Sequence, residues 1–242
     1  NKNNERYYYN QLSADAKGIY DAMYMMYKND IFKTGSEEYD LVANGHLTNE
    51  QLAAYGGNQN TVLQVFGAAR DAFYADYPDI FYVDFSSLSI NITEKTNPGV
   101  SDNDAVVYQA SLGTGRATSY FTQEFTSQDA VKLAVGEQEK RINAIVQGAR
   151  QQSQSVKEQV IYVNNAIIEG TTYTSATGSN EYVRTSYGAL VKGESLCEGY
   201  ARAVKSVLDA MGIRSVLVQG YYRAPDGSDN LHMWNYVQID GK

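Results

Sequence analysis

The chain has 242 residues, 43% of them hydrophobic, which is enough apolar material for one large domain or two small ones. Twenty Lys and Arg against 28 Asp and Glu give a net charge of -8, so the basic charge typical of nucleic-acid-binding proteins is missing. One Cys excludes a disulfide framework and multi-Cys zinc patterns, and two His argue against a His-rich metal site. We therefore expect no metal, no cofactor and no nucleic-acid partner. No run of about 20 apolar residues is present, so we also expect no membrane span.

Helical patterns dominate the first 80 residues. Apolar and tyrosine residues recur at helical spacing over 13–29. Thr48 and Gln51 have the spacing of a capping box, which predicts a helix that begins near Asn49. A further helix is predicted from about 60 to 76, after a Gly-Gly interruption and before a proline.

Strand-like segments follow. Ile80–Val83, Leu88–Thr93 and Ala105–Ser111 are rich in β-branched and aromatic residues with partial alternation. Asn97-Pro98-Gly99 has the composition of a turn between the last two. Residues 117–125 are a further candidate strand.

Helices return in the second half of the chain. Long periodic patterns predict helices over 128–152 and 156–169, and a loop rich in Thr, Ser and Gly follows over 170–180. The group of strands before about residue 125 and the helices after it indicate an α+β protein. We place an N-terminal helical and strand region at 1–125 and a second domain at 126–242.

The single thiol stands at a predicted helix start. Ser195 and Glu198 form a Ser-x-x-Glu pattern, which predicts a capping box with the helix beginning at Leu196 and ending near Gly212. Cys197 would then lie in the first turn, where free N–H groups and the helix dipole favour a thiolate. The alternative is that Cys197 is a small buried hydrophobe.

The chain then offers a base for this thiol. A strand over Ile213–Tyr222, turn residues, and a second strand that carries His232 can bring the imidazole to the thiol. A nucleophilic Cys needs such a base, oriented by a third polar group. Alternatively, His232 is a structural histidine. The other histidine, His46, precedes a helix in a loop and is expected to be surface-exposed.

The motifs around both residues resemble a known family. Gly193-x-x-x-Cys197-Glu-Gly-Tyr-Ala and, 35 residues after the Cys, His232-x-Trp-Asn-x-Val-x-x-Asp-Gly-Lys resemble the transglutaminase-like core. The variant is the one found in secreted and surface proteins of Gram-positive bacteria, and the resemblance covers about residues 155–242.

The resemblance implies a papain-like arrangement in which a helix that carries the Cys packs on an antiparallel sheet, preceded by an α/β N-terminal region. Cys197 would be the nucleophile and His232 the general base. The family's Asp would follow Lys242 on the next strand, whereas Asp240 matches a turn residue of the family. On this interpretation the core is truncated at its C-terminus, and residues 1–242 alone would show little or no activity.

The resulting hypothesis is cysteine-dependent acyl transfer on protein or peptide amides, by a peptidase, amidase or transglutaminase, through a thioester. The N–H of Cys197 would be the first oxyanion donor, with Tyr182 or Tyr187 as candidates for the second. The rival hypothesis is a non-catalytic binding or structural module that keeps the fold. The resemblance further implies a location outside the cell or at its surface, near cell-wall or surface substrates, with any signal segment absent from this chain.

Overall fold

The computed structural model describes residues 6–34, 37–55, 58–95, 107–115, 119–239 and 241. The expected turn at 97–99, the Gly-Gly interruption at 56–57 and Asp240 lie outside these residues. The chain divides into two compact units. The N-terminal unit comprises Tyr8–Asp76 and Tyr82–Gln123, and the C-terminal unit comprises Glu124–Lys242 with Asn1–Tyr7 and Tyr77–Phe81. The sequence-based division at residue 125 stays a prediction.

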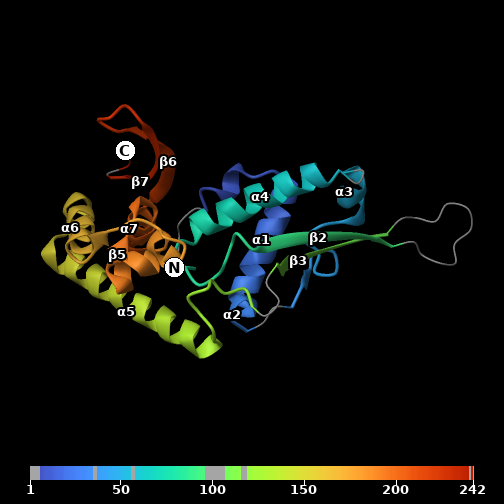
Figure 1. Cartoon of the computed structure of the whole chain (residues 1–242), viewed down its shortest axis with the longest axis horizontal. Helices are drawn as coiled ribbons and strands as arrows, with labels where there is room; N and C mark the ends of the chain where they lie inside the picture. Colours follow the sequence, from blue (N-terminus) through green and yellow to red (C-terminus); the bar gives the residue numbers. More distant parts are fainter. Residues whose placement is uncertain are drawn as a thin grey trace, which may run out of the picture. The chain divides into compact units, whose positions relative to one another are not determined.

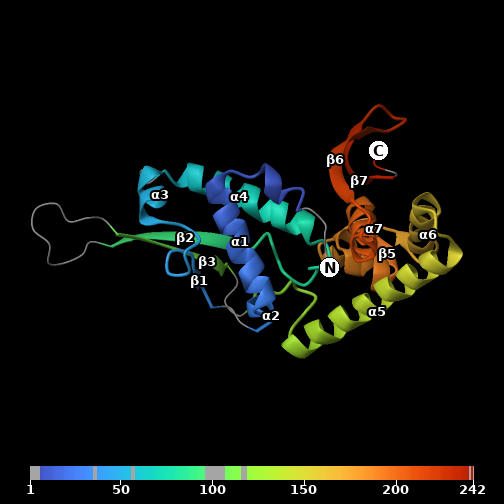
Figure 2. The ribbon, with the colours of Figure 1, turned by 180° about the vertical axis from the view of Figure 1, so that it is seen from behind.

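The N-terminal unit combines helices with a small antiparallel sheet. Its helical elements are η1 (Tyr9–Gln11), α1 (Ala14–Lys28), α2 (Ile31–Thr34), α3 (Asn49–Ala54) and α4 (Gln59–Asp76). Its strands are β1 (Tyr39–Asp40), β2 (Leu88–Lys95) and β3 (Val107–Thr114), in the order β1-β3-β2. Helix α4 lies alongside β2 in both views (Figures 1 and 2).

The predicted N-terminal helices are confirmed. Ser13 caps α1 by accepting a hydrogen bond from the N–H of Ala16, and the Thr48–Gln51 capping box is present at the start of α3. Helix α1 buries Tyr20, whose ring meets that of Phe73 edge-on at 5.3 Å and so joins α1 to α4.

Two predicted strands are absent from the described residues. Ile80–Val83 and the described part of 117–125 form no strand and share only the isolated bridge Val83–Phe121. Their apolar residues are buried although the segments join no sheet. Composition alone cannot distinguish a buried irregular segment from a buried strand.

The C-terminal unit is built around one central helix. Its longer elements are α5 (Gln128–Gln152), α6 (Val156–Glu169), α7 (Cys197–Met211), β6 (Ser215–Arg223) and β7 (Asp229–Val237). Its short ones are β4 (Thr172–Tyr173), η2 (Glu181–Arg184), η3 (Gly188–Lys192) and β5 (Glu194–Ser195). Figures 1 and 2 show α7 between α5 and α6 on one side and the β6–β7 hairpin on the other.

The core of this unit is an apolar cluster. Ile145 of α5, Val163 of α6 and Val207 of α7 are among its buried members. At its C-terminal end α7 is joined to β6, since the buried Lys205 pairs with Asp209 at 3.0 Å and donates to the carbonyl of Ser215 at 3.2 Å. Burial of the apolar side chains of the cluster is the main contribution to the free energy that stabilises α7 in this position.

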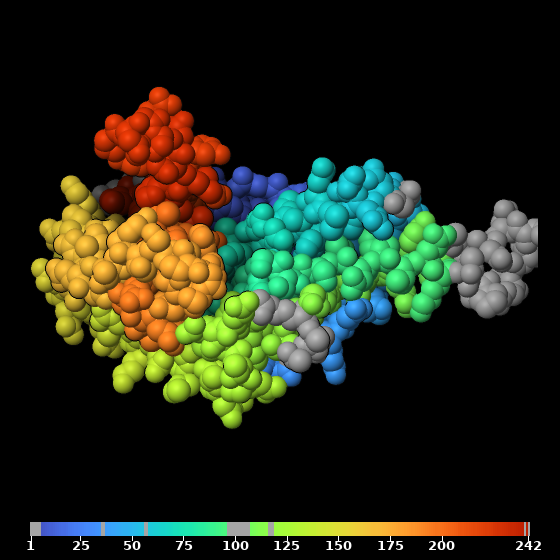
Figure 3. Space-filling view, in the orientation of Figure 1, coloured from blue at the N-terminus to red at the C-terminus, as the bar shows by residue number. Residues whose placement is uncertain are grey.

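The hairpin is a two-stranded antiparallel sheet with an exposed tip. Its tip stands clear of the rest of its unit in the space-filling view (Figure 3), and Tyr221 is 75% exposed. At its base, the side-chain amide of Asn235 donates to the carbonyl of Ala201 in α7 at 2.9 Å. The packing of the Cys-bearing helix on an antiparallel sheet is therefore confirmed. The fold is mixed α+β, as expected.

Candidate active site

Cys197 is the first residue of α7, one position away from the predicted helix start. Leu196 is the N-cap, with an extended backbone and no side-chain cap. The predicted capping box is wrong, because the Ser195 hydroxyl is buried and lies 3.0 Å from the carbonyl oxygens of both Val183 and Leu196. Strand β5 holds Ser195 away from the helix terminus, and the first N–H groups of α7 are left without a side-chain cap.

The acidic residue beside the thiol is neutralised by arginines. Glu198 lies in the first turn of α7, where a carboxylate interacts favourably with the helix dipole. Its carboxylate accepts from the guanidinium of Arg202 at 2.9 Å and lies 3.7 Å from that of Arg184. Because the Arg202 side chain is only 6% exposed, this pair is shielded from water, and the repulsion between Glu198 and a neighbouring thiolate is reduced.

His232 lies on β7, opposite Gly220 of β6. Its imidazole stands between two aromatic rings, with centroids 6.2 Å from Trp234 and 6.1 Å from Tyr222. The Trp234 ring covers Gly220, where an added Cβ would come within 2.8 Å of the indole. The glycine thus allows the indole to lie across the hairpin beside the imidazole.

The structure brings Cys197 and His232 to one cavity of about 580 Å³ in the C-terminal unit. Both are half-buried, and among the described residues no hydrogen bond joins the thiol to the imidazole. The cavity is lined by residues of α6, α7, β4 and β7. Among the described residues of this lining, only His232 can carry a positive charge. The lining residues are Val160, Ile161, Asn164, Ile167, Ile168, Tyr173, Cys197, Tyr200, Ala201, Val204, His232, Met233, Trp234, Asn235 and Val237. An uncharged carbonyl compound can enter such a site without losing the solvation of an ion.

The two tyrosines proposed as oxyanion donors lie elsewhere. The hydroxyl of Tyr182 donates to Glu194 at 2.8 Å, and that of Tyr187 lies 3.4 Å from Glu137. Neither lines the cavity. The tyrosine that does lie beside the thiol is Tyr173, which the sequence did not single out, because it stands in a short strand inside a polar, loop-like segment.

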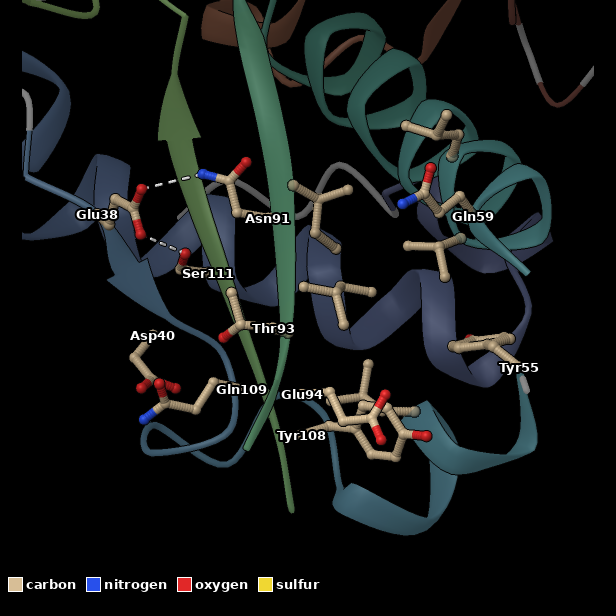
Figure 4. Close-up of a pocket in the computed structure, with 16 residues that line it drawn as sticks. Glu38, Asp40, Tyr55, Gln59, Asn91, Thr93, Glu94, Tyr108, Gln109 and Ser111 are labelled. Atoms are coloured by element: carbon tan, nitrogen blue, oxygen red, sulfur yellow. Dashed lines mark hydrogen bonds between the residues drawn. The ribbon is translucent and has the colours of Figure 1, made fainter. Parts of the chain in front are cut away.

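A larger cavity, of about 980 Å³, lies in the N-terminal unit (Figure 4) and contains neither thiol nor imidazole. Its lining falls on two faces of the sheet. On one face the carboxylate of Glu38 accepts from Asn91 at 2.9 Å and from Ser111 at 2.6 Å. Since the thiol and the imidazole line the smaller cavity, the candidate Cys–His chemistry lies there.

Among the described residues, no group of three His, Cys, Asp or Glu side chains is placed to hold a metal ion. Over the same residues, no helix is both long enough and apolar enough to span a bilayer.

The family-model comparison agrees with the resemblance found in the sequence. Residues 141–242 match the family model of the transglutaminase-like superfamily, and no curated protein matches the chain. A solved structure of "a TGase" is 14% identical with a TM-score of 0.38, over 65% of this chain and 43% of that one. A "putative cysteine protease" from Cytophaga hutchinsonii is 11% identical with a TM-score of 0.34, over 67% of this chain and 66% of that one. The chain thus spans less than half the length of the first protein and about two thirds of the second. The family match covers residues 141–242, the part of the chain that includes Cys197 and His232.

Proposed function

We propose that Cys197 and His232 are the nucleophile and the general base of a cysteine-dependent acyl transfer on protein or peptide amides, carried out by the full-length protein. The observation that supports this proposal is the meeting of the two side chains in one cavity, with the thiol at the N-terminus of α7. The family match supports amide carbonyls of proteins as the substrates of this proposal. By the same resemblance, the proposed location is outside the cell or at its surface.

The reaction divides into two steps. The thiolate of Cys197 adds to the amide carbonyl, the C–N bond breaks, and imidazolium His232 gives its proton to the departing amine. The product is a thioester. Water then attacks the thioester to give a carboxylic acid, or a primary amine attacks it to give a new amide, and in either case the attacking group loses a proton to His232.

Thiol reactivity tests the pair directly, because Cys197 is the only cysteine in the chain. We expect iodoacetamide at pH 6 to alkylate Cys197 at least about tenfold faster than a free cysteine peptide, since the thiolate is the reacting species. Replacement His232→Asn should remove this advantage. The matched control is His46→Asn, which changes the only other histidine and should leave the rate unchanged.

Mass spectrometry then identifies the intermediate. An activated ester such as p-nitrophenyl acetate should acylate the wild-type protein once and the Cys197→Ala variant not at all. Incorporation of a fluorescent primary amine into a protein substrate would indicate transamidation, and release of new termini would indicate peptidase activity. A thiol no more reactive than the free peptide, and indifferent to His232→Asn, would refute the proposal in favour of a non-catalytic module.

A further inference from the structure

Tyr173 is held beside Cys197 by the short parallel pairing of β4 with β5. In this register Tyr173 stands opposite Ser195, two residues before the thiol. The N–H of Thr174 donates to the carbonyl of Ser195 at 2.9 Å and fixes the pairing. Tyr173 and Cys197 both line the cavity that His232 enters.

The ring of Tyr173 is positioned by α7 itself. It stacks on Tyr200, one helical turn after Cys197, with centroids 6.1 Å apart and an interplanar angle of 12°. The hydroxyl of Tyr200 donates to the carbonyl of Thr171 at 2.7 Å, which ties the stack back to the chain just before β4. Because Tyr173 is 62% exposed, its ring can shift along this stack without displacing buried atoms.

Tyr173 and Cys197 are neighbours in the lining of the cavity. Although the side chain is largely exposed, partial desolvation of its hydroxyl raises the pKa of Tyr173, and the charge of a neighbouring Cys197 thiolate raises it further. With its pKa above the ordinary value of 10, the phenol remains protonated at neutral pH. It is therefore a hydrogen-bond donor next to the reacting sulfur.

We propose that the Tyr173 hydroxyl is the second oxyanion donor, acting together with the N–H of Cys197. This inference rests on the proposed function. When the thiolate adds to a carbonyl, the carbonyl oxygen gains negative charge next to the N–H of Cys197. The phenol turns on its stack to donate its O–H to that oxygen, and the N–H of Cys197 donates to the same oxygen.

The variant that tests this role is Tyr173→Phe, which removes one oxygen and keeps the ring and its stack on Tyr200. We expect acylation by p-nitrophenyl acetate to slow by about a hundredfold, the typical effect of losing one oxyanion donor. Alkylation by iodoacetamide should stay within about twofold of wild type, because displacement at a saturated carbon creates no oxyanion. The matched control, Tyr221→Phe, changes an exposed tyrosine that does not line the cavity, and should alter neither rate.

Each other outcome has a definite meaning. Acylation at the wild-type rate in Tyr173→Phe would overturn the inference. A parallel loss of acylation and alkylation would assign Tyr173 to orienting the thiol, and faster acylation would assign it to blocking the oxyanion site, so both results also overturn it. Wild-type protein that is acylated no faster than Cys197→Ala would refute the proposed function itself.

Discussion

At the residue scale, burial shifts the pKa of His46, a residue of the N-terminal unit, with a measurable consequence for stability. The sequence-based expectation of a surface-exposed side chain is wrong, since His46 is half-buried and its Nε2 lies 3.1 Å from the hydroxyl of Tyr39. Burial lowers the pKa of His46 from 6.5, and the charge of Asp21 opposes this only in part. The folded protein therefore favours the neutral imidazole.

The direction of the pH dependence follows from this shift. Between the lowered folded-state pKa of His46 and the unfolded value of 6.5, the unfolded chain binds more protons than the folded one. The contribution of His46 to stability is therefore complete above pH 6.5 and is lost as the pH falls below it. Urea unfolding at pH 7.5 and 5.5 should show a smaller stability loss on acidification in His46→Gln than in wild type. Equal losses in the two proteins would contradict this prediction.

The candidate site was predictable only in part at this scale. Cys197 and His232 could be found because each stands in a local pattern that determines a helix start or a strand. Tyr173 could not be found, since its strand has two residues and its approach to Cys197 depends on pairing with a segment more than 20 residues away. The capping role predicted for Ser195 is wrong for the same reason, because its hydroxyl donates instead to the carbonyl of Val183, 12 residues earlier in the chain.

At the element scale, helices were predictable and short strands were not. Helix α5 was predicted with its correct bounds because its periodic burial and its Ser127 N-cap are local properties. Strands β1, β4 and β5 have two residues each and exist only through partners distant in the chain. Conversely, Ile80–Val83 has strand composition but packs as an irregular buried segment, which its own residues could not reveal.

The start of α7 depends on a close approach that only glycine permits. A Cβ at Gly199 would lie 2.2 Å from the hydroxyl oxygen of Ser195, 2.4 Å from the carbonyl oxygen of Val183 and 2.8 Å from that of Thr185. Two of these atoms are main chain and cannot rotate away. Gly199→Ala is therefore expected to lower the free energy of unfolding by about 1–3 kcal/mol, measured by urea unfolding.

A second glycine supplies the control for that substitution. Gly136 is exposed inside α5, and an added Cβ there would have no neighbour within 4 Å. Gly136→Ala should raise stability by about 0.5–1 kcal/mol, because alanine loses less backbone entropy in a helix. If Gly199→Ala proved as stable as wild type, the helix start would be less tightly packed than described.

At the scale of the whole molecule, the chain contributes a short segment from its first half to the C-terminal unit. Residues 77–81 belong to that unit, although the residues on both sides of them belong to the other. The buried Gln138 amide donates to the carbonyl of Asp79 at 3.0 Å, and the hydroxyl of Ser186 donates to the carbonyl of Pro78 at 2.8 Å. Because these groups are buried, loss of the segment would leave them without hydrogen-bond partners. Each unsatisfied group would lower the free energy of unfolding by about 1–3 kcal/mol.

Phe81 provides the test of this assignment. Its ring is buried and stacks on Tyr187 with centroids 4.5 Å apart. Phe81→Ala should lower the free energy of unfolding by about 3–5 kcal/mol. Amide hydrogen exchange should accelerate first in α5 and α7. The matched control is Phe73→Ala, which removes the ring packed on Tyr20 and should accelerate exchange first in α1 and α4. Exchange that rises equally in all four helices after Phe81→Ala would show that the segment stabilises both units rather than the C-terminal unit alone.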